Sequence, residues 1–386
     1  MSTAEPAPTP SAALKRTPLD ALHRARGGRM VPFAGYELPV QYAAGVLKEH
    51  LHTRAAASLF DVSHMGQIRL TPKSGRLADA AHALERLVPQ DIAALGPNRQ
   101  RYAQFTSAAG GILDDLMVTN LGDHLFLVVN AANKDADLHH LAAALSETCV
   151  VEAQFDRALL ALQGPKAAAA LDRIAPAAAG LRFMDVGTFR AGTIACLVSR
   201  SGYTGEDGFE ISVAAADAEA LAVALLDAEG VMPAGLGARD SLRLEAGLCL
   251  HGHDIDAATT PVEAALEWSI QKSRRAGGTR AGGFPGDARI LAELAAGAPR
   301  RRVGLRAEGR APVREGAPLF ADEVSPQPIG LVTSGGFGPS LNAPVAMGYV
   351  PTATAAPGNR VFADLRGQRL PMQVTALPFI TPTYKR

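Results

Sequence analysis

The sequence predicts an α+β fold in which two mixed α/β regions are followed by a small all-β region. From residue 31 to 150, short apolar strands alternate with segments of helical spacing, and a similar succession follows from residue 158 to 228. After residue 300, short strand candidates lie between turns rich in Gly, Pro and Asn, a pattern typical of a small barrel or sandwich. We therefore expect a domain boundary near residues 290–300.

In the first region, the spacing of apolar residues predicts helices over 74–88 and 131–145 and a strand over 123–130. Between them, residues 110–119 (GGILDDLMVT) place two adjacent carboxylates inside a strand candidate. Because side chains alternate between the faces of a strand, Asp114 shares the more apolar face and Asp115 the more mixed one. Burial raises a carboxyl pKa or demands a partner, which makes Asp114 the candidate functional acid. The alternative is that both acids cap a turn near the strand end.

In the second region, strands are expected at 158–163, 193–199 and 209–213, with helices after residue 164, over 214–228 and over 235–247. The loop over 199–208 (SRSGYTGEDG) matches neither the dinucleotide fingerprint nor the P-loop. Glu210 follows this loop on the strand face opposite Phe209. It is either a solvated side chain or a carboxylate that accepts paired hydrogen bonds from a guanine-like or pterin-like edge.

Two further patterns carry charge or possible ligands. Arg239 and Arg243 lie one turn apart in the helix expected over 235–247, where they form either an ordinary charged face or guanidinium groups placed for a planar acceptor. Residues 251–254 (HGHD) suggest part of a metal site, but a third ligand is not evident.

Residues 273–286 hold Gly, Arg and Pro with almost no apolar residues, so we expect a long exposed loop.

Composition excludes several classes of function. Lys and Arg total 38, as do Asp and Glu, so the formal net charge is zero, which argues against a dedicated nucleic-acid binder. No apolar run approaches the length of a membrane span, and three distant cysteines predict neither disulfides nor a cysteine metal site. The N-terminal residues are rich in Ala, Pro, Ser and Thr, which predicts a disordered tail rather than a secretory signal. Without a transit-like segment, a bacterial cytoplasm is the expected location.

Five blocks of sequence, taken in order, resemble the glycine cleavage system T protein family, the folate-dependent aminomethyltransferases. They are LFDVSHM (59–65), GGILDDL (110–116), GYTGEDG (202–208), ARDSLR (238–243) and AMGYV (346–350). The resemblance extends from about residue 17 to 384. It implies a three-domain cloverleaf with two mixed α/β domains around a central folate-binding hole. The expected divisions are a tail at 1–17, two interleaved α+β domains at 18–290 split near 150, and a barrel or jelly roll at 300–386.

The resemblance also implies the reaction and its partners. The aminomethyl carbon on the lipoyl arm of the H protein is transferred to tetrahydrofolate, which gives 5,10-methylenetetrahydrofolate and ammonia, without a metal. Asp114 matches the key acid of the family, Glu210 and Arg239 its substrate-binding pair, and Tyr384 a C-terminal tyrosine at the ligand. Further candidates for lining the pocket are Met65, Tyr102, Asn130 and Tyr203.

Four alternative functions differ from this one in the motifs or residues that they require. A folate-dependent demethylase normally carries a flavin domain, and no dinucleotide fingerprint is present. An iron–sulfur-maintenance relative would carry a Lys-Gly-Cys-Tyr type motif, which the sequence lacks. A non-catalytic folate-binding protein, or a metal hydrolase built on His251, His253 and Asp254, would belong to other classes.

Overall fold

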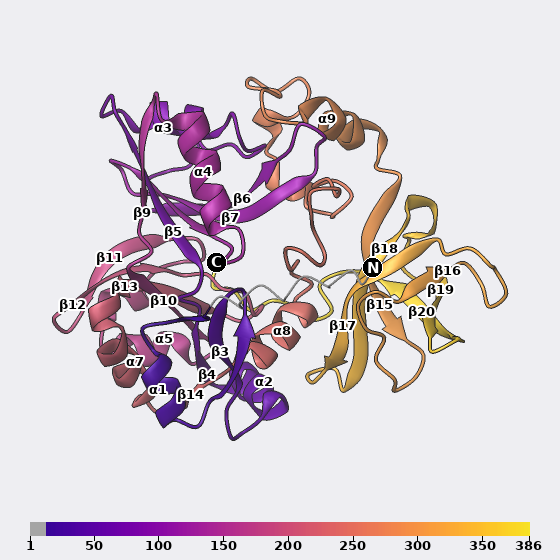
Figure 1. Cartoon of the computed structure of the whole chain (residues 1–386), viewed down its shortest axis with the longest axis horizontal. Coiled ribbons are helices and arrows are strands. Elements are labelled where there is room, and N and C mark those ends of the chain that lie inside the picture. Colours follow the sequence, from indigo (N-terminus) through magenta and orange to yellow (C-terminus); the bar gives the residue numbers. More distant parts are fainter. Residues whose placement is uncertain (1–12) are drawn as a thin grey trace, which may run out of the picture.

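The computed structural model describes residues 13–386 and has three lobes (Figure 1). Two lobes are mixed α/β structures built on sheets of five and six strands, and the third is a closed six-stranded barrel. The α+β fold class and the C-terminal barrel are thus confirmed. None of the helices within residues 13–386 combines the length and the apolar character needed to cross a bilayer.

The five-stranded lobe is an antiparallel sheet in the order β6-β7-β8-β5-β9. Its helices are α3 (Leu77–Leu84) and α4 (Lys134–Leu145), whose apolar residues share one core with the sheet. This confirms the helices expected over 74–88 and 131–145, with shorter bounds. The strands are β5 (Gly66–Pro72), β6 (Arg99–Thr106), β7 (Ile112–Asn120), β8 (Leu125–Val129) and β9 (Cys149–Ala153).

The six-stranded lobe has the order β11-β12-β13-β10-β4-β14. Since its β4 precedes the five-stranded lobe and its β10 follows it, the chain leaves this sheet and returns to it, so that the two lobes interleave. The strands are β4 (Ala57–Asp61), β10 (Arg157–Gln163), β11 (Val186–Ala191), β12 (Ile194–Ser199), β13 (Gly208–Ala214) and β14 (Val231–Pro233). The helices are α5 (Ala167–Asp172), α6 (Pro176–Ala179), η1 (Ala215–Asp217) and α7 (Ala218–Leu226).

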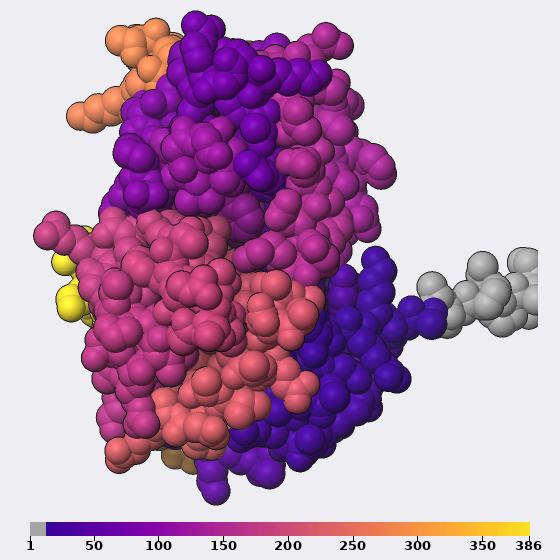
Figure 2. Space-filling view, turned by 90° about the vertical axis from the view of Figure 1, so that its left-hand side faces the viewer, coloured from indigo at the N-terminus to yellow at the C-terminus, as the bar shows by residue number. Residues whose placement is uncertain are grey.

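The N-terminal part of the described chain packs onto the six-stranded lobe. Figure 2 shows these indigo residues beside the salmon-coloured segment near residue 230, and Leu19 lies in the same core as Ala222. The segment holds β1 (Lys15–Arg16), α1 (Asp20–Ala25), β2 (Arg29–Phe33), β3 (Tyr36–Gln41) and α2 (Val46–Ala55). The expected tail at 1–17 therefore needs correction at its end, because Lys15 and Arg16 pair with β3 and Thr17 is buried. Residues 1–12 lie outside the described residues.

Residues 273–286, expected to form a long exposed loop, are mostly irregular, but several of them are buried. Arg274 is only 4% exposed and donates to the Glu85 carbonyl at 2.7 Å, while Phe284 joins an apolar cluster. The sequence pattern missed this burial because Arg274 is buried through hydrogen bonds to backbone carbonyls and Phe284 is a single apolar residue without periodic neighbours. The elements of the connection to the barrel are α8 (Leu236–Glu245), η2 (Glu267–Ser269), η3 (Lys272–Arg274) and α9 (Asp287–Ala296).

The barrel closes in the order β15-β18-β17-β16-β19-β20 around its own apolar core. Closure leaves no free sheet edge. The elements are β15 (Arg300–Ala307), β16 (Pro318–Phe320), β17 (Gly330–Gly338), β18 (Ala343–Pro351), η4 (Thr352–Thr354), β19 (Arg360–Leu365) and β20 (Gln368–Thr375). From β20 the C-terminal segment (residues 376–386) runs back to the two α/β lobes, where Figure 1 places its end.

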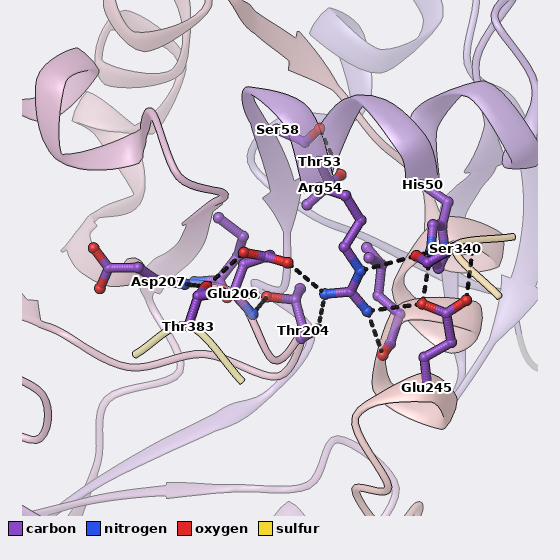
Figure 3. A network of polar contacts seen from close by, with 12 residues as sticks. His50, Thr53, Arg54, Ser58, Thr204, Glu206, Asp207, Glu245, Ser340 and Thr383 are labelled. Atoms are coloured by element: carbon purple, nitrogen blue, oxygen red, sulfur yellow. Dashed lines mark hydrogen bonds and ion pairs between the residues drawn. The ribbon is translucent and has the colours of Figure 1, made fainter. Parts of the chain in front are cut away.

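A polar network centred on Arg54 of α2 joins these parts (Figure 3). Its guanidinium donates to Glu206 at 3.0 Å, to Glu245 of α8 at 3.1 Å and to Ser340 of the barrel at 3.3 Å. Thr383 of the C-terminal segment donates to the other oxygen of Glu206 at 2.5 Å. Arg54, which is partly buried, therefore contacts the six-stranded lobe and the barrel, and it is linked to the C-terminal segment through Glu206.

Candidate active site

The two acids of β7 lie on opposite faces of the five-stranded sheet, as the alternation predicts. Asp114 is 0% exposed, together with the buried Ile112 and Leu116. Asp115 is partly exposed, and its neighbour on the same face, Leu113, is 38% exposed. The predicted burial of Asp114 is confirmed, and the structure adds that Asp115 is the acid on the more open face.

Asp114 is held by amide donors rather than by apolar side chains alone. The backbone N–H of Asn130 donates to its Oδ2 at 3.1 Å, and the Asn130 side chain donates to its Oδ1 at 2.9 Å. Asn133 donates to Oδ1 at 2.8 Å and also to His251 Nδ1 at 3.1 Å. Such donors stabilise the ionised form of a buried carboxyl group. Asp114 is therefore a buried acceptor for three amide donors, which come from Asn130 and Asn133.

Asp115 shares the Asn130 amide, which donates to its Oδ1 at 2.7 Å. Burial and the neighbouring charge of Asp114 raise the pKa of Asp115 to about 6. The Tyr102 ring stacks on Trp268, with centroids 5.5 Å apart, and Trp268 is 61% exposed. Asp115 thus titrates close to neutral pH and lies near an aromatic surface open to solvent.

Glu210 and Arg239 approach from the six-stranded lobe and α8. Ser201 donates to Glu210 at 3.0 Å, and the Arg239 guanidinium lies 4.8 Å from the ring centroid of Tyr203. Arg239 Nη1 is buried without a hydrogen-bond partner among the described residues. Burial lowers the pKa of Arg239, and the charge of Glu210 opposes this. Burying a hydrogen-bond donor without a partner costs free energy. Arg239 is therefore suited to donate a hydrogen bond to an acceptor atom of a ligand.

Tyr203 connects this group to the acids. Its hydroxyl donates to the Cys249 carbonyl, and burial raises its pKa, with a contribution from the charge of Asp115. Met65, which is partly buried, packs against the apolar cluster that includes Ala238, next to Arg239. The structure therefore brings together most of the residues expected at the site, namely Asp114, Asn130, Tyr102, Tyr203, Glu210 and Arg239, and it adds Asp115 to them.

Tyr384 lies in a different environment. Its ring stacks on Phe183 with centroids 4.3 Å apart, and Phe183 N donates to the Lys385 carbonyl at 2.7 Å. The charges that act on its raised pKa, after burial, are those of Arg54 and Glu206. Within residues 13–386, no hydrogen bond, ion pair or ring contact links Tyr384 to the two acids, so its expected role at the ligand stays a prediction.

The residues of the HGHD motif serve different partners. Asp254 is 1% exposed and accepts from Arg243 at 2.7 Å, while His253 is exposed and contacts Glu315. His251 instead joins the acid pair, because its Nδ1 lies 3.8 Å from Asp114 Oδ1. In the part of the chain that the structure describes, no three His, Cys, Asp or Glu side chains converge as a metal site requires.

Sequence reasoning missed Asn133, Asp137 and Trp268 and saw His251 only as a metal ligand. Asn133 and Asp137 are one turn apart at the start of α4 and follow Asn130, a spacing that places them on one side of a helix. That spacing, set beside the acids, was a usable signal. Trp268 lies in the short helix η2, for which the sequence offers no comparable pattern.

Comparison with known proteins agrees with this fold. The GCVT N-terminal domain model matches residues 19–274, and the glycine cleavage T-protein C-terminal barrel domain model matches residues 300–380. Mitochondrial aminomethyltransferases from Homo sapiens and Dictyostelium discoideum are 47% and 43% identical, over 96% and 97% of this chain and 91% and 94% of theirs. The crystal structure of the glycine cleavage system aminomethyltransferase T from Bartonella henselae is 45% identical. It superposes with a TM-score of 0.88, over 97% of this chain and all of that one.

Fold and site thus define an α+β protein of two interleaved lobes and a barrel, with one buried acid beside a partly exposed one. The chain belongs to the glycine cleavage T-protein family, the aminomethyltransferases. The resemblance seen in the five sequence blocks is confirmed.

Proposed function

We propose that this chain transfers the aminomethyl carbon from the lipoyl arm of an H protein to tetrahydrofolate. The carbon loses its bonds to ammonia and to the lipoyl sulfur and gains bonds to N5 and N10 of the folate. The two protons displaced from these nitrogens leave with ammonia and the dihydrolipoyl thiol. The single observation that carries the proposal is the Asp114–Asn130–Asp115 group, in a chain of the aminomethyltransferase family.

The two acids are proposed to have different parts in this chemistry. Loss of ammonia leaves an electron-poor carbon, and a fixed carboxylate stabilises that positive charge and can take up a proton from a folate nitrogen. Asp114, the acid expected from the sequence, is proposed to act from the buried face of the sheet without facing the reacting carbon, because three donors already occupy its oxygens. Asp115, on the more open face, is the carboxylate proposed to face the reacting carbon.

Glu210 and Arg239 are proposed to bind the folate. A carboxylate matches the amino and N3–H edge of a pterin. The unpartnered Nη1 of Arg239 is available to donate to an acceptor such as the pterin carbonyl oxygen. Tyr102, Tyr203, Met65 and Asn130 are proposed as the surrounding surface. A bacterial cytoplasmic location stays a prediction, since the relatives from human and Dictyostelium are named mitochondrial.

The test compares Asp115→Asn with Asp114→Asn, using aminomethylated H protein and tetrahydrofolate and measuring ammonia release. We expect Asp115→Asn to lower kcat by about 100-fold or more while stability and folate affinity stay close to wild type. We expect Asp114→Asn to lose most turnover and also about 1–3 kcal/mol of stability, because one amide donor would face the Asn130 N–H. Wild-type turnover should rise as pH increases through about 6, as Asp115 ionises.

Three outcomes would contradict parts of this proposal. Near-normal turnover of Asp115→Asn would exclude it as the charge that meets the substrate. Loss of turnover in Asp114→Asn alone, with stability unchanged, would return the catalytic role to Asp114. Folate binding without any ammonia release by the wild type would identify a non-catalytic folate-binding protein.

A further inference from the structure

Asp137 is a buried acid that the proposed reaction does not use. It lies in the first turn of α4, is 5% exposed, and its backbone N–H donates to the Asn133 carbonyl at 2.8 Å. Its Oδ2 is buried without a hydrogen-bond partner among the described residues. An ionised carboxyl group that lacks donors in such a place is strongly disfavoured.

The hydrogen-bond acceptor positions of Asp114 show where a protonated Asp137 would donate its O–H. An ionised carboxylate offers about four lone-pair positions. Oδ1 of Asp114 accepts from the Asn130 and Asn133 side chains, and Oδ2 accepts from the Asn130 backbone N–H. One position on Oδ2 is therefore left. Asp137 lies one turn along α4 from Asn133, whose side chain donates to Asp114, so an O–H on the Asp137 carboxyl group is suitably placed to occupy that position.

Two buried carboxyl groups in contact cannot both be charged at moderate cost. Asp114 has three amide donors that stabilise its negative charge, whereas Asp137 has none on its buried Oδ2. Burial, the hydrogen bond to Asp114 and the charges of Asp114 and Asp115 raise the pKa of Asp137 to about 9. The proton of the pair therefore resides on Asp137 at neutral pH.

The other ionisable groups nearby do not change this assignment. Lys134, one turn before Asp137, directs its ammonium group to the Tyr36 hydroxyl and the His64 carbonyl. Burial lowers the pKa of His140, which keeps this imidazole neutral. His251 lies 3.8 Å from Asp114 Oδ1 and accepts a hydrogen bond from Asn133. Burial, followed by the charge of Asp115, raises the pKa of Tyr102, so this phenol stays neutral too.

We propose that Asp137 is a positioning residue for this site, which stays protonated and donates its O–H to Asp114. The hydrogen bonds then run from Asp137 on α4 to Asp114 on β7, from there to Asn130 at the end of β8, and on to Asp115. Three elements are thereby fixed around the acid on the open face. The effect on turnover rests on the proposed function, whereas the location of the proton does not.

The test uses two substitutions of the full-length protein. Asp137→Asn keeps an N–H donor toward Asp114, whereas Asp137→Leu has a similar volume and no donor. We expect Asp137→Leu to lower kcat by roughly 10- to 100-fold, because Asp115 is displaced, with little change in KM for tetrahydrofolate. We expect Asp137→Asn to restore kcat to near the wild-type value. The exposed Asp135→Asn on the same helix is the matched control and should change neither.

Two further readouts separate positioning from a merely structural role. Wild-type turnover should fall as pH rises through about 9, when Asp137 ionises, and Asp137→Asn should keep its turnover there. Infrared spectra of the unliganded protein should contain a protonated carboxyl band that Asp137→Asn removes and Asp135→Asn keeps. The inference is overturned if that band is absent, or if Asp137→Asn loses as much turnover as Asp137→Leu. If the band is present but the wild type releases no ammonia, the proposed function fails and the proton assignment stands.

Discussion

Asn130 links the two acids, because its side-chain amide donates a hydrogen bond to each of them. One side-chain amide donates to Asp114 at 2.9 Å and to Asp115 at 2.7 Å, although the two carboxylates lie on opposite faces of β7. Because an amide has two N–H donors in fixed geometry, it can hold both carboxylates only when both are correctly placed. A shift of the buried acid is thus passed to the partly exposed one.

Glu210 provides the residue-scale prediction. Glu210→Gln should raise the tetrahydrofolate dissociation constant by more than about tenfold, since a hydrogen bond to a charged group contributes about 1.5–3 kcal/mol. Isothermal titration calorimetry measures this directly. Glu219→Gln on the exposed side of α7 is the control and should leave the constant unchanged. An unaltered constant for Glu210→Gln would remove this residue from the folate site.

At the scale of elements, the start of β7 is fixed by close contact with the segment after α8. A Cβ atom at Gly111 would lie 1.8 Å from the Ala257 carbonyl oxygen. The next residue, Ile112, donates its N–H to the carbonyls of Asp256 and Thr259 at 3.0 Å each. Glycine is therefore required where the backbones of β7 and the segment containing His251 approach each other.

Gly111→Ala should therefore destabilise the protein by about 1–3 kcal/mol, because the Ala257 backbone has to move. Urea unfolding followed by circular dichroism measures the loss. Gly180→Ala, whose Cβ would meet nothing closer than 3.6 Å, should change the free energy of unfolding by less than about 0.5 kcal/mol. Equal stability of the two variants would show that the segment after α8 adapts without cost.

The same elements show how far the sequence predicts this structure. Periodicity located β7, α4 and the barrel, because regular alternation along one chain reports which face is buried. It also placed Asp114 on the buried face and Asp115 on the other. It did not locate Asn133, Asp137 or Trp268, since their places depend on how α4 and η2 pack against β7. Nor did it show that Tyr384 stacks on Phe183, a contact between distant segments that leaves no local pattern.

At the scale of the whole molecule, the network around Arg54 joins parts that have separate cores. The six-stranded lobe and the barrel each bury their own apolar cluster, and the Arg54 guanidinium donates to Glu206 of the lobe and to Ser340 of the barrel (Figure 3). His50 also contacts both Glu245 at 3.0 Å and Ser340 at 2.9 Å. These bonds resist relative movement of the barrel and the lobe.

Arg54→Met should cost about 3–5 kcal/mol, because Glu245 and Glu206 would remain buried without this cation. Their side chains are 0% and 7% exposed. Scanning calorimetry should then resolve a separate barrel transition. Arg76→Met removes an ion pair whose arginine is 77% exposed and should have an effect near zero. A single unshifted transition in Arg54→Met would mean that apolar contacts alone hold the barrel in place.

The C-terminal segment gives this architecture a consequence for its biosynthesis. Thr383 N donates to the Gly205 carbonyl at 2.9 Å, and Phe379 N donates to the Glu245 carbonyl at 3.0 Å. On the ribosome, Gly205 and Glu245 emerge well before their partners are translated. The nascent lobes must therefore persist with these carbonyls open to water, and the final assembly step waits until residue 383 leaves the exit tunnel.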